Sequence, residues 1–231
     1  VAVVGFDIVF AEKDESSGLK VLQELGDKQL QDDAQFQGVL EKIRPQLEYD
    51  KVFAEKIRGR PVILGYYFSI SEGVAEAAAG VLPPPVLPAD TFKGRGIPFW
   101  KGYSYGSNLP ELMQAAAGAG HFSMLPDFDG VARRVPMLLE FNGAYYESLS
   151  LAVVRALFNF PKVAPGIPAT VTSQDYSGVE WLELQGENFN LKIPVDPSVS
   201  ALVPYRGGRG SFKYISITDV LRERVNPEDL K

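Results

Sequence analysis

The sequence predicts an α/β fold, in which a single domain has a mixed, partly parallel sheet and flanking helices. Val1–Phe10 and Pro61–Phe68 are nearly continuous apolar runs rich in β-branched and aromatic residues, which is typical of buried parallel strands. Between these runs, apolar residues recur at steps of three and four, which indicates helices. A strand, a helical region and a second strand in this order predict a right-handed crossover between parallel neighbours.

The composition supports a folded domain and argues against several classes of function. The 231 residues are 45% hydrophobic and 23% charged, as in ordinary globular proteins. A net charge of −6 disfavours binding to nucleic acid or to an anionic membrane surface. Without cysteine, and with His121 as the only histidine, the chain cannot build the usual zinc or iron–sulfur sites. We therefore expect no metal and no cofactor.

Residues 1–231 are interpreted as one domain, because no linker rich in proline and serine divides them. The chain begins with an apolar run and without methionine, so we expect it to be part of a longer protein. No segment approaches the roughly 20 apolar residues of a membrane helix. Any attachment to a membrane is therefore expected only through segments that flank this chain.

The helical region contains its own stop signals. Pro45 is expected to break or kink a first helix. In a second helix, Asp50 is expected as the N-cap and Gly59 as the residue just beyond the C-terminus. Residues 71–105 are rich in proline and glycine and lack periodicity, so they are predicted to form a long surface loop of the kind used as a lid.

The middle of the chain changes from helix to strand. Asn108 is expected to cap an alanine-rich helix that ends near Gly118–Gly120. His121–Leu125 and Val131–Phe141 are predicted to pair antiparallel across an Asp129-Gly130 turn.

The last third is predicted to contain a helix and several short strands. Asn142-Gly143 forms a turn, and Ser148 caps a helix that runs to Phe158. Ser216 or Thr218 begins a final helix. The strands are expected at Val179–Leu184, Phe189–Ile193 and Ala201–Tyr205.

One motif suggests catalysis. Gly102-Tyr103-Ser104-Tyr105-Gly106 matches the G-x-S-x-G nucleophile elbow of serine hydrolases. That elbow needs an acid and then a histidine later in the chain, and only Glu111 separates Ser104 from His121. A serine hydrolase using Ser104 is therefore kept as the alternative, and no catalytic residue is assigned.

Arg133 and Arg134 begin an apolar strand, where alternation directs one guanidinium to each face of the sheet. At least one is expected to be buried against a carboxylate, with Asp7 and Asp129 as the first candidates. The alternative is a pocket that binds a carboxylate or phosphate.

Other positions leave the same choice between a structural and a binding role. Asp7 lies near the C-terminal end of the first strand, where open α/β sheets bind ligands. Tyr205-Arg206 opens a glycine-rich turn with Arg209 that could hold an anion. The candidate residues for binding a small polar or anionic ligand are Asp7, His121, Asp129, Arg133, Arg134, Tyr205 and Arg206.

Several motifs occur in a recognisable order and spacing. They are Gly5-Phe6-Asp7-Ile8-Val9-Phe10, Val62-Ile63-Leu64-Gly65-Tyr66-Tyr67-Phe68, Ala119-Gly120-His121-Phe122, Pro126-Asp127-Phe128-Asp129-Gly130-Val131, Arg133-Arg134-Val135-Pro136, Tyr146-Glu147-Ser148-Leu149, Ile193-Pro194 and Tyr205-Arg206-Gly207. Together they resemble the second CHASE family of extracytoplasmic sensory domains. Residues 71–105 match nothing in that family, whose members also extend beyond both ends of this chain, with membrane helices after the C-terminal side.

The resemblance implies a non-catalytic, ligand-sensing part of a bacterial inner-membrane receptor that lies in the periplasm or outside the cell. The cytoplasmic output of such receptors is a nucleotide cyclase, a histidine kinase, a serine/threonine kinase or a diguanylate cyclase. We expect an adenylate or guanylate cyclase first. A homodimer is left open.

Overall fold

The centre of the fold is the parallel strand pair that the two apolar runs predict. The structure is a computed structural model and describes residues 1–72, 78–167, 178–208 and 210–230. Strand β1 (Val4–Phe6) pairs in parallel with β2 (Val62–Ser69), which confirms the predicted pair. The run of β2 is apolar because both of its faces are covered, and Ile63 and Leu64 are completely buried.

Two further strands make this sheet mixed, as predicted. Strand β5 (Gly118–His121) lies parallel to β2 on the side away from β1, and β4 (Ser104–Gly106) pairs antiparallel with the end of β2. Gly118–Gly120 therefore forms a strand, although the sequence predicts a helix end there. The helix before it, α4 (Pro110–Ala115), is shorter than expected.

Asn108 is not the cap of α4, whose N-cap residue is Leu109. The Asn108 amide instead donates to the Gly65 carbonyl at 2.9 Å, and its oxygen accepts from the Phe10 amide at 2.9 Å. This buried side chain therefore joins β2 to the segment that follows β1.

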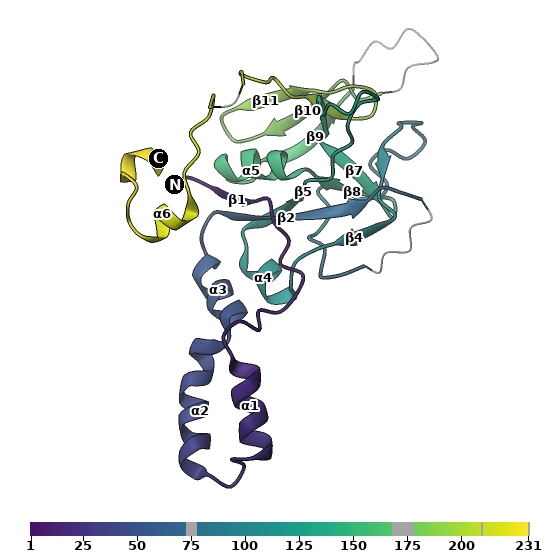
Figure 1. Cartoon of the computed structure of the whole chain (residues 1–231). Helices are drawn as coiled ribbons and strands as arrows, with labels where there is room; N and C mark the ends of the chain where they lie inside the picture. Colours follow the sequence, from purple (N-terminus) through teal and green to yellow (C-terminus); the bar gives the residue numbers. More distant parts are fainter. Residues whose placement is uncertain (73–77, 168–177, 209, 231) are drawn as a thin grey trace.

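Three helices connect β1 to β2. Helices α1 (Leu19–Lys28) and α2 (Ala34–Leu47) form an antiparallel hairpin that projects from the body, and α3 (Tyr49–Ile57) leads back to it (Figure 1). Pro45 lies in the last turn of α2, which ends two residues later. Asp50 is not the cap of α3, because the N-cap residue is Glu48 and Asp50 lies in the first turn. The Asp50 carboxylate instead accepts from the Asp14 amide at 2.9 Å.

The described part of segment 71–105 is irregular over most of its length, as the sequence predicts, but it is not confined to the surface. Outside residues 73–77, which are not described, it carries Leu87, Phe92 and Phe99 into a core. The ring centroids of Phe92 and Phe99 lie 4.8 and 4.7 Å from that of Tyr145. Its end forms β3 (Trp100–Lys101), which pairs in parallel with β7 (Leu138–Phe141). The absence of periodicity reflects irregular backbone that nevertheless buries aromatic side chains.

The predicted hairpin across Asp129-Gly130 is wrong. Strand β6 (Arg134–Pro136) pairs instead with β12 (Ser200–Leu202), and β7 pairs with β8 (Ala144–Glu147). The Asn142-Gly143 turn has φ values of +50° and +80°, which suit a two-residue hairpin, so β7 obtains its partner locally. His121, at the start of the other segment of the predicted hairpin, belongs to β5 and pairs with β2.

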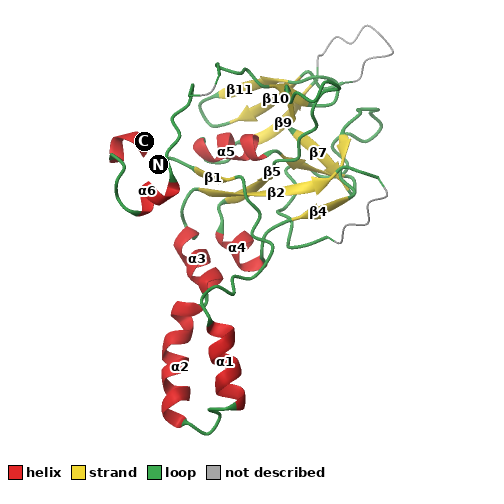
Figure 2. Ribbon diagram, viewed as in Figure 1, coloured by secondary structure: helices red, strands yellow, loops and turns green. Residues whose placement is uncertain are grey.

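The last third agrees more closely with the prediction. Ser148 caps α5 (Leu149–Leu157) by accepting from the Leu151 amide at 3.2 Å. Figure 2 shows this helix beside β1 and β5. Strands β9 (Lys162–Gly166), β10 (Trp181–Gln185) and β11 (Asn190–Pro194) form an antiparallel sheet, and β9 is the member that the sequence does not predict. A short helix, α6 (Ile217–Leu221), begins after Ser216, and a 3-10 turn spans Pro227–Leu230.

Candidate functional site

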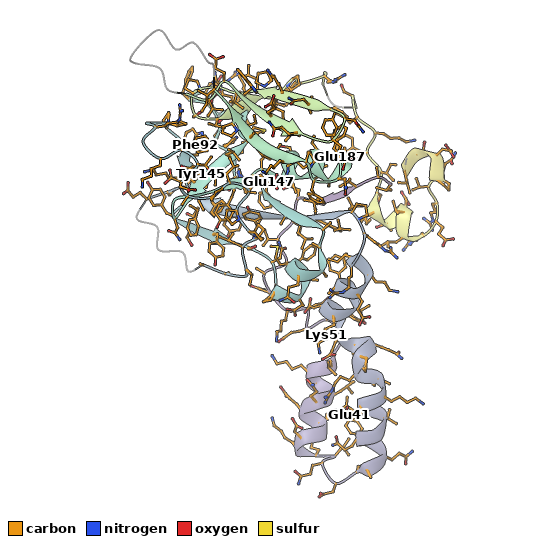
Figure 3. The ribbon with its side chains drawn as sticks, turned by 180° about the vertical axis from the view of Figure 1, so that it is seen from behind. Glu41, Lys51, Phe92, Tyr145, Glu147 and Glu187 are labelled. Carbon is orange, nitrogen blue, oxygen red and sulfur yellow. The ribbon has the colours of Figure 1, made fainter. Side chains whose placement is uncertain are left out.

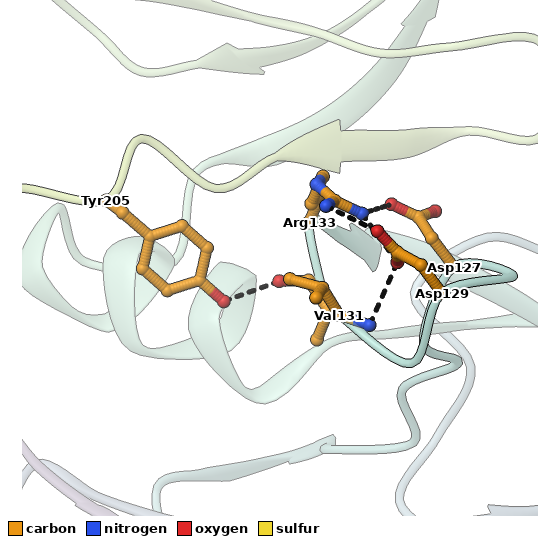
Figure 4. A network of polar contacts seen from close by, with 6 residues as sticks. Asp127, Asp129, Val131, Arg133 and Tyr205 are labelled. Carbon is orange, nitrogen blue, oxygen red and sulfur yellow. Dashed lines mark hydrogen bonds and ion pairs between the residues drawn. The ribbon is translucent and has the colours of Figure 1, made fainter.

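The turn before β6 is a closed polar network (Figure 4). The Arg133 guanidinium donates to both carboxylate oxygens of Asp129, at 2.8 and 2.7 Å, and to Asp127 at 3.2 Å. Arg133 thereby holds the pKa of Asp129 below its ordinary value. The Tyr205 hydroxyl donates to the Ala132 carbonyl and fixes the end of β12 to the same turn. Three predicted binding residues thus come together, with their polar groups already paired.

Arg134 lies on the other side of this turn, in a cleft of about 340 Å³. Its guanidinium donates to Asp196 at 2.6 Å. Asp196 is fixed in place, because it also accepts from the Ser198 and Ser200 amides at 3.0 and 2.9 Å. We name this site the arginine cleft, and its lining residues are Trp100, Leu125, Pro126, Asp127, Phe128, Arg134, Pro136, Asp196, Ser198 and Ser200.

The arginine cleft has the composition of a site for a small polar molecule. Arg134 supplies charged donors, the serine hydroxyls supply donors and acceptors, and Trp100 and Phe128 supply aromatic walls. Phe128 is completely exposed and Trp100 is 38% exposed, so both rings have surface that a ligand could cover. Three regions that are distant in the sequence contribute: β3 from the 71–105 segment, residues 125–136, and residues 196–200.

A second hollow of about 610 Å³ lies where β1 and β5 end and α5 begins. Asp7, just after β1, and His121, the last residue of β5, both border it. The strand-end argument was made for Asp7, and ligand binding there stays a prediction. The Asp7 carboxyl group is exposed and does not pair with Arg133 or Arg134. The His121 ring faces away, because it packs against Tyr66 and Phe68, with centroid distances of 6.4 and 6.0 Å. Asp7 is therefore the one charged side chain at this hollow.

His121 belongs to the interior. It is completely buried, and burial lowers its pKa to about 3, so the imidazole is neutral at physiological pH. Neither ring nitrogen has a hydrogen-bond partner of regular geometry among the described residues. A packing role explains this histidine better than a catalytic one, because the ring is buried against Tyr66 and Phe68 and neither of its nitrogens has a regular hydrogen bond among the described residues.

A buried ion pair lies nearby that the sequence analysis missed. Glu147, at the end of β8, accepts from Arg155 on α5, and the two side chains are only 12% and 14% exposed. Burial raises the pKa of Glu147 to about 7, although Arg155 acts in the opposite direction. Figure 3 shows Glu147 in the interior, near Tyr145. Arg155 is the one charged residue of the apolar helix α5, and this isolation could have marked it.

The remaining candidates are not part of a site. Ser104 lies inside β4 and is 7% exposed, whereas a nucleophile elbow needs an exposed turn between a strand and a helix. Arg206 is exposed beyond β12 and borders neither hollow. Arg209 lies outside the described residues. In the part of the chain that the structure describes, no three acidic or histidine side chains are grouped to hold a metal ion.

The sequence predicts that Arg133 or Arg134 is buried, but both side chains are about half exposed. Removing either ion pair is therefore expected to change the stability only slightly. The Arg134 side chain is 49% exposed, so Arg134→Met is expected to lower the free energy of unfolding by at most about 1 kcal/mol. Arg133→Met should likewise leave the urea midpoint nearly unchanged, because its guanidinium is exposed to solvent. Urea unfolding of the two variants tests this, and a loss typical of a buried pair in either would contradict it.

One of three comparisons with known proteins gives a match. A sequence model of the CHASE2 domain matches residues 1–231, the whole chain, so the match includes residues 71–105, for which the sequence analysis found no counterpart in the family. No curated protein and no solved structure gives a significant match. Among the described residues, no helix has the length and hydrophobicity needed to cross a bilayer. The chain therefore belongs to the CHASE2 family of extracytoplasmic sensory domains.

Proposed function

We propose that this domain binds a small polar or anionic molecule in the arginine cleft and passes the signal to a nucleotide cyclase in its parent receptor. Family membership supplies the extracytoplasmic sensory role. The observation that supports the cleft as the site is the position of Arg134, held by Asp196 beside two serine hydroxyls and two partly or wholly exposed aromatic rings.

The cleft is also suited to transmit a signal. Its lining comes from β3, from the turn before β6, from β6 itself and from the turn before β12. A ligand that contacts these segments together would favour one arrangement of them over another. Such differential binding is the condition for shifting a conformational equilibrium.

Thermal denaturation with a library of small polar and anionic metabolites tests the site. A true ligand should raise the unfolding midpoint of the wild-type protein. Arg134→Met should remove this shift, and Arg206→Met is the matched control because Arg206 is exposed and outside the cleft. A shift that survives Arg134→Met, or that Arg206→Met abolishes, would contradict the proposed site, as would a complete absence of stabilising compounds.

The output domain is proposed from the family resemblance. An adenylate or guanylate cyclase is the first candidate because such sensors are commonly joined to cyclases, and a histidine or serine/threonine kinase is the second. The parent receptor would be an inner-membrane protein with this domain in the periplasm or outside the cell. The coding sequence downstream of Lys231 decides between these outputs directly.

A further inference from the structure

The buried pair of Glu147 and Arg155 joins two elements of the fold. Glu147 ends β8, whose hairpin with β7 fixes the backbone, whereas Arg155 lies in the last turn of α5. One oxygen of Glu147 accepts from Arg155, and the other, Oε2, is buried with no hydrogen-bond partner in the described part of the chain. Arg155 is thus the group that compensates this buried carboxylate.

Arg155 also holds the turn that follows α5. Its Nε donates to the Pro161 carbonyl at 3.0 Å, and its guanidinium carbon lies 5.8 Å from the centroid of the Phe160 ring. Asn159 and Phe160 both have positive φ, at +59° and +55°. Two successive residues other than glycine in the left-handed region make this turn strained, and such strain persists only where other contacts impose it.

The strained turn connects two parts of the molecule. It leads from α5 into β9, which is the first strand of the β9–β10–β11 sheet. The Phe160 ring also lies over Gly118 at the start of β5, since a Cβ on Gly118 would be 3.3 Å from it. A change in this turn would therefore reach both the central sheet and the second sheet.

We propose that Glu147 and Arg155 form a proton-operated latch, so that extracytoplasmic acidification neutralises Glu147, frees Arg155 and allows the strained turn at 158–161 to relax. The inference goes beyond the proposed function, because it assigns a second stimulus, the proton, that does not depend on the ligand of the arginine cleft. No bond is formed or broken other than the O–H bond of the carboxyl group.

The direction follows from the fixed position of Glu147. When Arg155 leaves, Glu147 stays buried at the end of β8 and loses the cation that lowers its pKa. The released state therefore binds a proton more tightly than the latched state, and acid favours release. Burial sets the pKa of Glu147 near 7 in the latched state, which places the transition close to neutral pH.

The other titratable groups around Glu147 do not change charge between pH 8 and pH 6. Tyr66 on β2 interacts with Glu147, and its burial raises its pKa well above the ordinary value. His121 on β5 stays neutral because burial lowers its pKa to about 3. Burial also raises the pKa of Tyr145 and of Tyr146, both on β8. The charge of Glu140 on β7 raises the pKa of Tyr145 further.

Hydrogen exchange of the full 231-residue protein, without ligand, tests the latch. The amide of Phe160 bonds to the Arg155 carbonyl at 2.7 Å and reports on the turn. After correction for the intrinsic exchange rate, protection of residues 155–166 is expected to fall about fivefold or more between pH 8 and pH 6. Glu147→Gln should show the low protection at both pH values, and Glu140→Gln, on the neighbouring strand, should retain the wild-type dependence.

Three results would overturn the latch: equal protection of wild type at pH 8 and pH 6, wild-type behaviour of Glu147→Gln, or loss of the pH dependence in Glu140→Gln. If Glu147→Gln does not fold, carboxyl-carbon NMR of the wild type decides. A glutamate that titrates near pH 7 with the same midpoint as the exchange supports the latch, and titration of every glutamate below about pH 5.5 refutes it. A failed ligand screen leaves these outcomes unaffected.

Discussion

Gly120→Ala is expected to destabilise the domain by about 3 kcal/mol or more, because the new methyl group would collide with backbone. A Cβ on Gly120 would lie 2.5 Å from Cα of Leu149 and 2.6 Å from the Ser148 carbonyl oxygen. These atoms belong to the capped first turn of α5 and cannot rotate away as a side chain could. Urea unfolding with several structural probes measures the change.

Gly38→Ala is the matched control. Gly38 lies inside α2, and nothing is within 4 Å of the position that its Cβ would occupy. Because alanine is a better helix former, this variant is expected to be more stable than wild type by up to about 1 kcal/mol. If Gly120→Ala left the midpoint unchanged or raised it, as is expected of Gly38→Ala, the close packing of α5 on β5 would be refuted.

Arg155→Met has the second large expected effect, and it depends on pH. At pH 8 the variant leaves the Glu147 carboxylate buried without its cation, which costs about 3–5 kcal/mol. Because burial raises the pKa of Glu147 above its unfolded value, the charged form is the unfavourable one in the fold. In the variant the carboxyl group lacks the cation that lowers its pKa, so its pKa lies above the wild-type value of about 7. The difference between variant and wild type should therefore shrink as the pH falls from 8 toward 7 and stay constant below about 7, where Glu147 is protonated in both folded proteins.

The stability of the variant is compared with that of wild type at each pH, because the titration of His121 changes the stability of both proteins equally. Its lowered pKa means that its contribution to stability is lost as the pH falls below 6.5 toward 3. Lys51→Met is the control, since the Lys51–Glu48 pair is exposed and is worth at most about 1 kcal/mol. A loss for Arg155→Met that is the same at pH 8 and pH 5.5 would show that Glu147 does not titrate in this range.

Features with local causes could be predicted from the sequence. The Ser148 cap and the Asn142-Gly143 turn depend on a few adjacent residues, and both are confirmed. The parallel pair of β1 and β2 followed from two apolar runs and a crossover rule. The pairing of β6 with β12 could not be predicted in this way, because its partners are separated by more than 60 residues.

The candidate site could be predicted only in part, again because some of the interacting residues are far apart in the sequence. The arginines next to a turn made Arg134 a candidate, and Arg134 lines a cleft, although its role in binding stays a prediction. Its partner Asp196 lies 62 residues away, so the sequence suggested Asp7 or Asp129 instead. Glu147 alone resembles an ordinary surface charge, and although Arg155 is conspicuous as the one charged residue of α5, only the tertiary packing shows that the two side chains are buried together.

Trp100 can report directly whether a signal molecule binds in the arginine cleft. The chain has two tryptophans, so Trp181→Phe leaves Trp100, in the cleft wall, as the sole reporter. A compound that stabilises the domain should change Trp100 emission in a saturable titration, and the change should disappear in Trp181→Phe/Arg134→Met. A compound that stabilises the domain while Trp100 emission stays constant would place the ligand elsewhere and contradict this account.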